Sequence, residues 1–230
     1  MYQHLFAIVD RLPLSWRPPE SLLGPVELRV ADGFDVISSG CDRAPAANAR
    51  TLASHEQVVA AAMGADALLP CRFGTGVPAV ALDGWLAAHA GRIRATLAQV
   101  RGSVEMNVKL LRLYRGHGTG RASPDAVADA GGAAEIRRFA DRLVESAGLG
   151  RWRFRGSSHG ENVAGSVAFL VARDEVGTFL ARIAPVASRA GEIAVVPTGP
   201  WPAYSFVGSF ERPPLARVAA TVGRADRLTG

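Results

Sequence analysis

The five histidines are the side chains of this chain best suited to holding a metal ion or moving a proton. His55 and His89 each lie on the apolar stripe of an expected helix, and neither has a His, Asp or Cys nearby in the sequence at the spacing of metal ligands. His117 and His159 lie in stretches of Gly and Ser, where a surface position is expected. The sequence therefore predicts buried, hydrogen-bonded histidines at 55 and 89, and it predicts no metal site.

Other candidate catalytic motifs are incomplete. Gly116, Gly118 and Gly120 resemble a phosphate-binding turn, but the dinucleotide fingerprint needs a glycine where Arg121 stands, so a flexible linker is expected here. Lys109 is the only lysine, which excludes a Gly-Lys-Ser/Thr phosphate loop. Because no cluster of acids, bases or nucleophiles is recognisable, we expect neither enzymatic activity nor a cofactor.

Two segments that are far apart in the sequence are instead rich in residues that fix backbone shape. Residues 68–75 read Leu-Leu-Pro-Cys-Arg-Phe-Gly-Thr, and residues 197–207 read Pro-Thr-Gly-Pro-Trp-Pro-Ala-Tyr-Ser-Phe-Val. Pro and Gly set the backbone conformation, and the aromatic rings offer flat apolar surface. The pattern indicates a protein that works by shape and contact.

The composition is that of a folded chain with one large domain or two small ones. Of its 230 residues, 48% are apolar and 20% are charged, and the formal net charge is +5. Cys41 and Cys71 are the only cysteines, too few for a disulfide framework. The N-terminus lacks the features of a signal peptide, and no apolar run reaches the length of a membrane-spanning helix. We expect a soluble, cytoplasmic protein.

The first half is expected to combine strands and helices. A wholly apolar run at residues 5–9 is typical of a strand buried on both faces. Apolar residues recur at three- and four-residue steps in two later stretches, which predicts helices. The expected order is strand, hairpin, helix, strand and helix, at residues 5–9, 26–38, 46–63, 68–73 and 82–100.

The second half has the element order of a ferredoxin-like split βαβ fold. The expected strand, helix, strand, strand, helix and strand lie at residues 104–110, 136–147, 152–155, 163–171, 176–187 and 193–196. In the first of these strands apolar residues alternate with Glu105, Asn107 and Lys109, which predicts one solvent-exposed face. An alternative gives this strand to the first half, and the sequence leaves both options open.

Arg151, Arg153 and Arg155 alternate with Trp152 and Phe154, so one face of this strand is basic and the other apolar. A basic sheet with aromatic residues can grip nucleic acid, but here the aromatic and basic side chains point to opposite sides. The pattern favours a solvated basic face and a buried apolar face. The tail at residues 213–230 has an apolar helical stripe, which fits either a frayed terminus or a helix that docks on a partner.

These segments together resemble the gas vesicle proteins GvpF and GvpL. Family features matched here are the apolar first strand and a helix with His55 followed by Leu-Pro-x-Arg-Phe-Gly-Thr at residues 69–75. The others are Gly102, Glu105, Val108 and Lys109 of a Gly-x-x-Glu strand, a strand at 162–171, and Gly-Pro-Trp-Pro-x-Tyr-Ser-Phe at 199–206. The likeness covers residues 2–210, with departures at Cys71 and Ala203.

The resemblance implies an α+β fold of two domains, the second ferredoxin-like. We expect an N-terminal α+β domain at 1–115, the ferredoxin-like domain at 116–212 and a tail at 213–230. It also implies a minor structural component or assembly factor of gas vesicles, which binds the small apolar shell protein during nucleation and growth and contacts other gas vesicle accessory proteins. Neither nucleic acid nor a membrane is an expected partner. The alternative is an RNA- or ligand-binding module on a ferredoxin-like scaffold.

The two motifs supply the expected partner-binding residues. Prolines 197, 200 and 202 stiffen the last motif, so that little entropy is lost when it docks. Its aromatic rings then either contact a shell subunit or pack the two domains together, and the sequence does not decide between these roles. The expected partner-binding residues are Arg72, Phe73, Pro200, Trp201, Tyr204 and Phe206.

Overall fold

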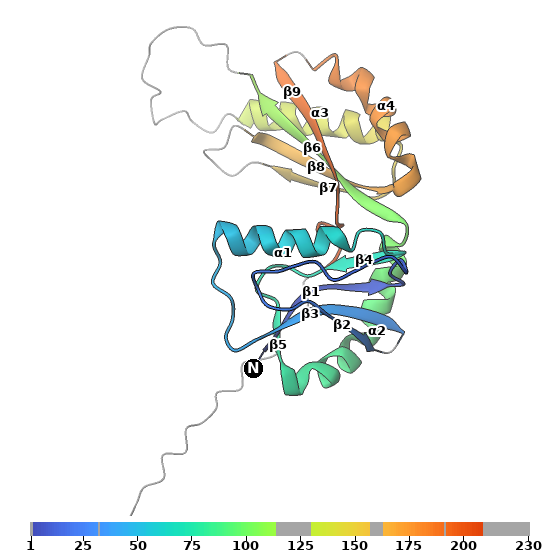
Figure 1. The fold of residues 1–230 in the computed structure, drawn as a ribbon. Helices are drawn as coiled ribbons and strands as arrows, with labels where there is room; N and C mark the ends of the chain where they lie inside the picture. The colour runs from blue at the N-terminus through green and yellow to red at the C-terminus, as the bar shows by residue number, and fades with distance from the viewer. Residues whose placement is uncertain (1, 32, 114–129, 157–162, 191, 209–230) are drawn as a thin grey trace, which may run out of the picture.

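The computed structural model describes residues 2–31, 33–113, 130–156, 163–190 and 192–208. Within these ranges the chain forms two antiparallel sheets, one after the other along the sequence, with helices packed on each (Figure 1). His117, His159, the glycines at 116–120, the boundary expected at 115/116 and the tail from residue 213 lie outside the described residues. No helix in the described ranges is long and apolar enough to cross a membrane.

The first sheet is built around a fully buried strand. Its strands are β1 (Tyr2–Asp10), β2 (Glu27–Ala31), β3 (Phe34–Cys41), β4 (Ala67–Pro70) and β5 (Gly76–Pro78). Their order is β2-β3-β1-β4, and β5 also pairs with β1. Residues 5–9 have no exposed surface, which confirms the strand expected to be buried on both faces.

Helices on both faces of this sheet explain why β1 is apolar on both sides. α1 (Ala49–Ala61) shares a buried cluster with Phe6 and Val9. α2 (Leu82–Val100), which follows a short 3₁₀ helix (Ala79–Ala81), shares another cluster with Leu5 and Ile8. Alternate side chains of one strand therefore pack under different helices.

Several boundaries in this half differ from the sequence-based prediction, and two of them have a clear local cause. α1 begins at Ala49, three residues after the expected start, because the Asn48 side chain caps it by accepting bonds from the N–H groups of Arg50 (3.0 Å) and Thr51 (3.1 Å). The strand predicted at 68–73 ends at Pro70. The chain turns there, since the carbonyl of Arg72 accepts a hydrogen bond from the Thr75 N–H (3.0 Å).

The second sheet has the ferredoxin-like arrangement. Its strands are β6 (Ser103–Arg112), β7 (Trp152–Gly156), β8 (Val163–Ala172) and β9 (Ile193–Trp201), in the order β7-β8-β6-β9. α3 (Ala130–Ala147) connects β6 to β7, while a 3₁₀ turn (Arg173–Glu175) and α4 (Val176–Ala187) connect β8 to β9. β6 pairs with β8 and β9, so the strand that the sequence left unassigned belongs to the second sheet.

The two faces of the second sheet differ in chemistry. α3 and α4 cover one face, and Trp152 and Phe154 of β7 pack with the core on that side. Arg153 and Arg155 are exposed, as the alternation in the sequence predicts. Because opposite residues of paired antiparallel strands share a face, the strand pairing places Lys109 on the same side as Arg155, both opposite Ser166. We call this side, away from α3 and α4, the open face.

Candidate functional site

The segment that follows β9 runs between the two halves of the molecule. Residues 202–207 leave the second sheet after Trp201 (Figure 1). Ala203 and Phe206 are buried. Phe206 belongs to a cluster with Val100 at the end of α2 and Leu170 of β8. We call residues 202–207 and the groups that they contact the junction.

Glu105 anchors the junction from the second sheet. Its carboxylate accepts hydrogen bonds from the Ser205 N–H (2.8 Å) and from the Ser205 hydroxyl (2.8 Å). The prediction of a solvent-exposed face at Glu105 is therefore wrong: this side chain is 5% exposed. The segment after β9 covers it and replaces water as its hydrogen-bond donor.

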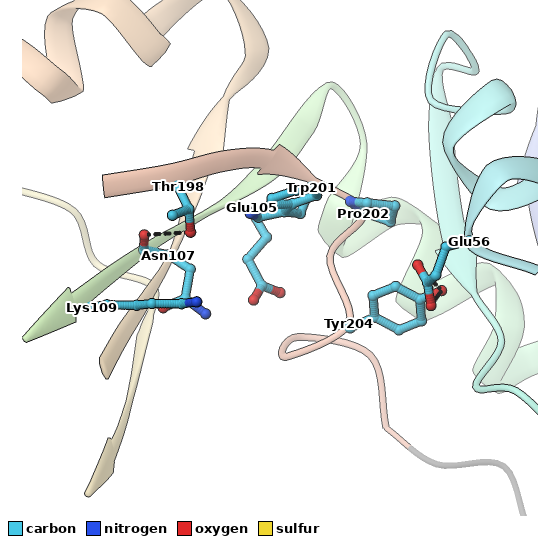
Figure 2. A pocket seen from close by; sticks show the side chains of 8 residues that line it. All are labelled: Glu56, Glu105, Asn107, Lys109, Thr198, Trp201, Pro202 and Tyr204. Carbon is cyan, nitrogen blue, oxygen red and sulfur yellow. Dashed lines mark hydrogen bonds between the residues drawn. The ribbon is translucent and has the colours of Figure 1, made fainter. Parts of the chain in front are cut away.

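Tyr204 anchors the junction to the first half. Its hydroxyl donates to the Glu56 carboxylate of α1, 3.2 Å from Oε1 and 3.3 Å from Oε2 (Figure 2). Burial, followed by the nearby Glu56 charge, raises the pKa of Tyr204, so the phenol keeps its proton and remains a donor. Burial also raises the pKa of Glu56, while the bond from Tyr204 acts in the opposite direction.

The turn after β4 brings the first motif to the same region. Arg72 is exposed, and its carbonyl accepts bonds from both the N–H (3.0 Å) and the hydroxyl (2.7 Å) of Thr75. Phe73 is half-buried and packs, like Tyr204, on the cluster beneath α1. Two segments that are far apart in the sequence thus meet around α1.

Both histidines predicted to be buried and hydrogen-bonded are bonded as expected. His55 is fully buried, and its Nε2 lies 2.9 Å from the Cys71 carbonyl. His89, half-buried on α2, donates from Nδ1 to the Trp85 carbonyl (2.7 Å). The sequence did not reveal His4, whose Nε2 lies 2.9 Å from Nδ1 of His55. Among the described residues, no group of three or more His, Cys, Asp or Glu side chains is arranged to hold a metal ion.

The six expected partner-binding residues fall into two sets. Phe206, Tyr204 and Phe73 are wholly or partly buried and pack within the molecule. Arg72 and Pro200 are exposed, and Trp201 is 51% exposed. The second set offers the larger exposed surface to another molecule.

Two hollows flank the junction. The first, of about 330 Å³, is shown in Figure 2 and is lined by Glu56, Glu105, Asn107, Lys109, Thr198, Trp201, Pro202 and Tyr204. The second, of about 220 Å³, is lined by Arg72, Asn107, Arg153, Phe154, Arg155, Ser166, Ala168, Tyr204, Ser205 and Val207. They meet at Asn107 and Tyr204. Most of these side chains lie in segments that the sequence marks out, namely the two motifs, the polar alternation of β6 and the basic alternation of β7; Glu56, Ser166 and Ala168 carried no such signal.

One further sequence pattern resembles a catalytic motif. Residues 156–160 read Gly-Ser-Ser-His-Gly, which matches the Gly-x-Ser-x-Gly form of a nucleophile elbow. Such an elbow joins a strand to a helix, whereas these residues lie between two paired strands, β7 and β8. The context that gives the motif its chemistry is therefore not present.

Fold and junction define a class of protein: two α+β halves, the second ferredoxin-like, joined by the segment that follows the last strand. A family model described as gas vesicle synthesis protein GvpL/GvpF matches residues 3–115 and 130–208. The chain therefore belongs to this family, and its role is related to gas vesicles.

Solved structures agree with this assignment at the level of the fold. The chain is similar to the crystal structure of the gas vesicle protein GvpF from Anabaena sp. PCC7120, with a TM-score of 0.72 and 18% identity over 92% of this chain and 98% of that one. For GvpF from Microcystis aeruginosa the TM-score is 0.66 and the identity 16%, over 89% and 98%. A comparison with curated protein sequences gives no match.

Proposed function

We propose that this chain is a minor structural component or assembly factor of gas vesicles that binds the small apolar shell protein during nucleation and growth. It acts in the cytoplasm, at the growing vesicle, and it works by contact without catalysing a reaction. The observation that carries the proposal is the family match across both halves, together with an exposed aromatic ring in the most specific motif of that family.

Trp201 has the properties of an anchor for an apolar partner. It ends β9, beside the exposed Pro200 and the buried Pro202, so its backbone is held on both sides. A large ring that is already positioned loses little entropy when a partner covers it. Tryptophan is also enriched among the residues that dominate binding energy at protein interfaces.

The change Trp201→Ala tests this role. We expect capture of the purified shell protein to weaken at least about tenfold, because the loss of an interface anchor costs about 2 kcal/mol or more. The melting temperature should change little, since half of the ring is already exposed. Co-purification and calorimetric titration measure the first effect, and thermal unfolding measures the second.

Val80→Ala is the matched control, because Val80 is an apolar side chain that is 99% exposed and lies in the first half. It should leave capture of the shell protein unchanged. Full capture by the Trp201→Ala variant would contradict the anchor role of this ring. No capture by the unaltered chain would contradict the proposed function itself.

The aromatic rings of β7 give no support to the alternative of an RNA-binding module. Ferredoxin-like RNA-binding sheets stack bases on exposed aromatic rings. Trp152 and Phe154 of β7 pack instead with the core under α3, and the guanidinium of Arg137 lies over both rings, at 5.8 Å and 5.0 Å from their centres.

A further inference from the structure

The two hollows share Asn107 and Tyr204 in their linings, and together we call them the groove of the open face. The strand pairing aligns two rows of side chains on this face: Arg153, Ala168, Asn107 and Thr198 in one row, and Arg155, Ser166, Lys109 and Val196 in the other. Neighbouring strands lie about 4.8 Å apart, so Arg155 and Lys109 start from backbone positions about 10 Å apart. Side chains from all four strands therefore line this face in two aligned rows.

The basic groups of this groove have no acidic partner among the residues that the structure describes. Arg153, Arg155, Lys109 and, from the first half, Arg72 make no ion pair with any described residue. Arg153 donates to the Trp152 carbonyl (3.2 Å) and lies 5.7 Å from the centre of the Phe206 ring. Three of these cations line one hollow and Lys109 lines the other, and none of the four is paired with a described acidic side chain.

The acidic groups of the groove are already engaged. Glu105 accepts two bonds from Ser205, and Glu56 accepts the bond from Tyr204. Both carboxylates line the hollow that also contains Trp201. The three arginines, Arg72, Arg153 and Arg155, line the other hollow. The groove is therefore basic at the arginine end, whereas its other end combines the exposed Trp201 ring with the two bonded carboxylates, and Asn107 lines both.

We infer that this groove is a docking site for an extended, acidic segment of a partner protein. The carboxylates of this partner segment pair with Arg153, Arg155 and Arg72, and an apolar residue of the same segment packs on Trp201. The guanidinium group forms two parallel bonds with a carboxylate, which gives such a contact direction as well as energy. The inference rests on the proposed function for the class of partner, a protein of the gas vesicle assembly.

A protein segment fits this groove better than nucleic acid does. A phosphate backbone needs a continuous basic track and rings on which bases can stack. Here the track ends at Glu105 and Glu56, and the aromatic rings of β7 pack toward the core. A peptide with acidic residues at one end and an apolar residue at the other matches both ends of the groove.

The experiment uses the full chain and defined probes. Overlapping synthetic peptides that cover the shell protein and the other proteins of the same gas vesicle gene cluster are labelled with fluorescein, and their binding is followed by anisotropy. We expect the peptides that bind to be acidic, and their affinity to fall as salt is raised. The double change Arg153→Glu with Arg155→Glu should weaken them at least about tenfold, because it removes two charge-assisted hydrogen bonds and puts repelling carboxylates in their place.

The double change Arg138→Glu with Arg189→Glu is the matched control. It lowers the net charge equally, but both residues are exposed, on α3 and just after α4, on the other side of the sheet. This control should bind the acidic peptides as the unaltered chain does. Circular dichroism checks the fold, and Arg153→Gln with Arg155→Gln, a milder change, should give a smaller loss in the same direction.

Several results would overturn the inference. One is that the peptides that bind show no acidic bias, or that no peptide binds. Another is an equal loss of peptide affinity in the Arg153/Arg155 and Arg138/Arg189 double glutamate variants. A third is an oligodeoxythymidine that binds more tightly than every peptide and is released by the changes at Arg153 and Arg155. Capture of the intact shell protein is measured separately. If that capture persists while the acidic peptides fail, only the docking site is contradicted and the proposed function stands.

Discussion

At the residue scale, His4 and His55 form a buried chain of hydrogen bonds in which each ring nitrogen that takes part has a defined role as donor or acceptor. His55 Nε2 donates to the Cys71 carbonyl, so its Nδ1 accepts, and His4 Nε2 is the donor to it. Burial, followed by the charge of His55, lowers the pKa of His4 from 6.5 to about 4, and burial lowers the pKa of His55. Both rings are therefore neutral in the folded chain near neutral pH.

This chain of bonds predicts a loss of stability in acid. Below about pH 6.5 the unfolded chain protonates His4, whereas the folded chain does so only near pH 4. The unfolded state then binds more protons, so the contribution of this residue to the free energy of unfolding falls by about 1.4 kcal/mol per pH unit in this window. Urea unfolding between these two pH values, with His4→Gln as the comparison, measures it.

His4→Gln keeps an N–H donor near His55 but removes the ring that titrates, so its stability should depend less steeply on pH. His89→Gln leaves the buried pair intact and should behave like the unaltered chain. A pH dependence that is identical in all three proteins would show that the buried pair does not control acid stability.

At the element scale, β9 is shaped by an irregularity opposite Glu105. The pairing of β6 with β9 shifts register between Glu105 and Asn107, and Gly199 adopts a φ of +123° in this stretch. A Cβ atom here would lie 2.9 Å from the Glu105 carbonyl oxygen and 3.0 Å from the Met106 sulfur. Glycine is thus required both by the backbone conformation and by the space around it.

Gly199→Ala should therefore destabilise the chain. We expect a loss of about 1–3 kcal/mol, the usual cost of a residue held in an unfavourable backbone region, and urea unfolding measures it. Gly91→Ala on α2 is the matched control, because nothing lies within 4 Å of its added Cβ. That change should stabilise the chain by about 0.5–1 kcal/mol, and a similar loss in both variants would contradict the argument.

At the scale of the whole molecule, contacts from several elements hold the halves together. Arg173 of the second half donates to the Ala65 carbonyl of the first (3.1 Å), and Arg151 donates to the carbonyl of Gln99 in α2. The junction adds the buried Phe206 and the bonds of Glu105 and Tyr204. The motif at 199–206 therefore positions one half on the other as well as exposing Trp201.

Phe206→Ala tests this structural role. Removal of the ring leaves a cavity between Val100 and Leu170, and we expect a loss of about 3 kcal/mol in the free energy of unfolding. Trp201→Ala, in the same motif but half exposed, should cost about 1 kcal/mol or less. Equal losses in the two variants would mean that the burial difference between these rings does not determine their structural contributions.

The fold was predictable to the extent that it depends on local periodicity. Helices, buried strands and the ferredoxin-like order follow from patterns a few residues long, and each is present in the structure. The sequence could not assign β6 to a sheet, because alternation fixes which side chains share a face but not which strands are neighbours. It also missed the cover over Glu105, which comes from Ser205, far along the chain.

By itself the sequence determined the element types, the basic and apolar faces of β7, and the resemblance to the GvpF and GvpL proteins that the family match then established. These properties depend on residue type and on short-range spacing. Only the tertiary structure decided that Phe206 packs between the halves while Trp201 is half exposed, and that Arg72 joins Arg153 and Arg155 around one groove. Burial and proximity arise from contacts between distant segments, so no local pattern of residues contains them.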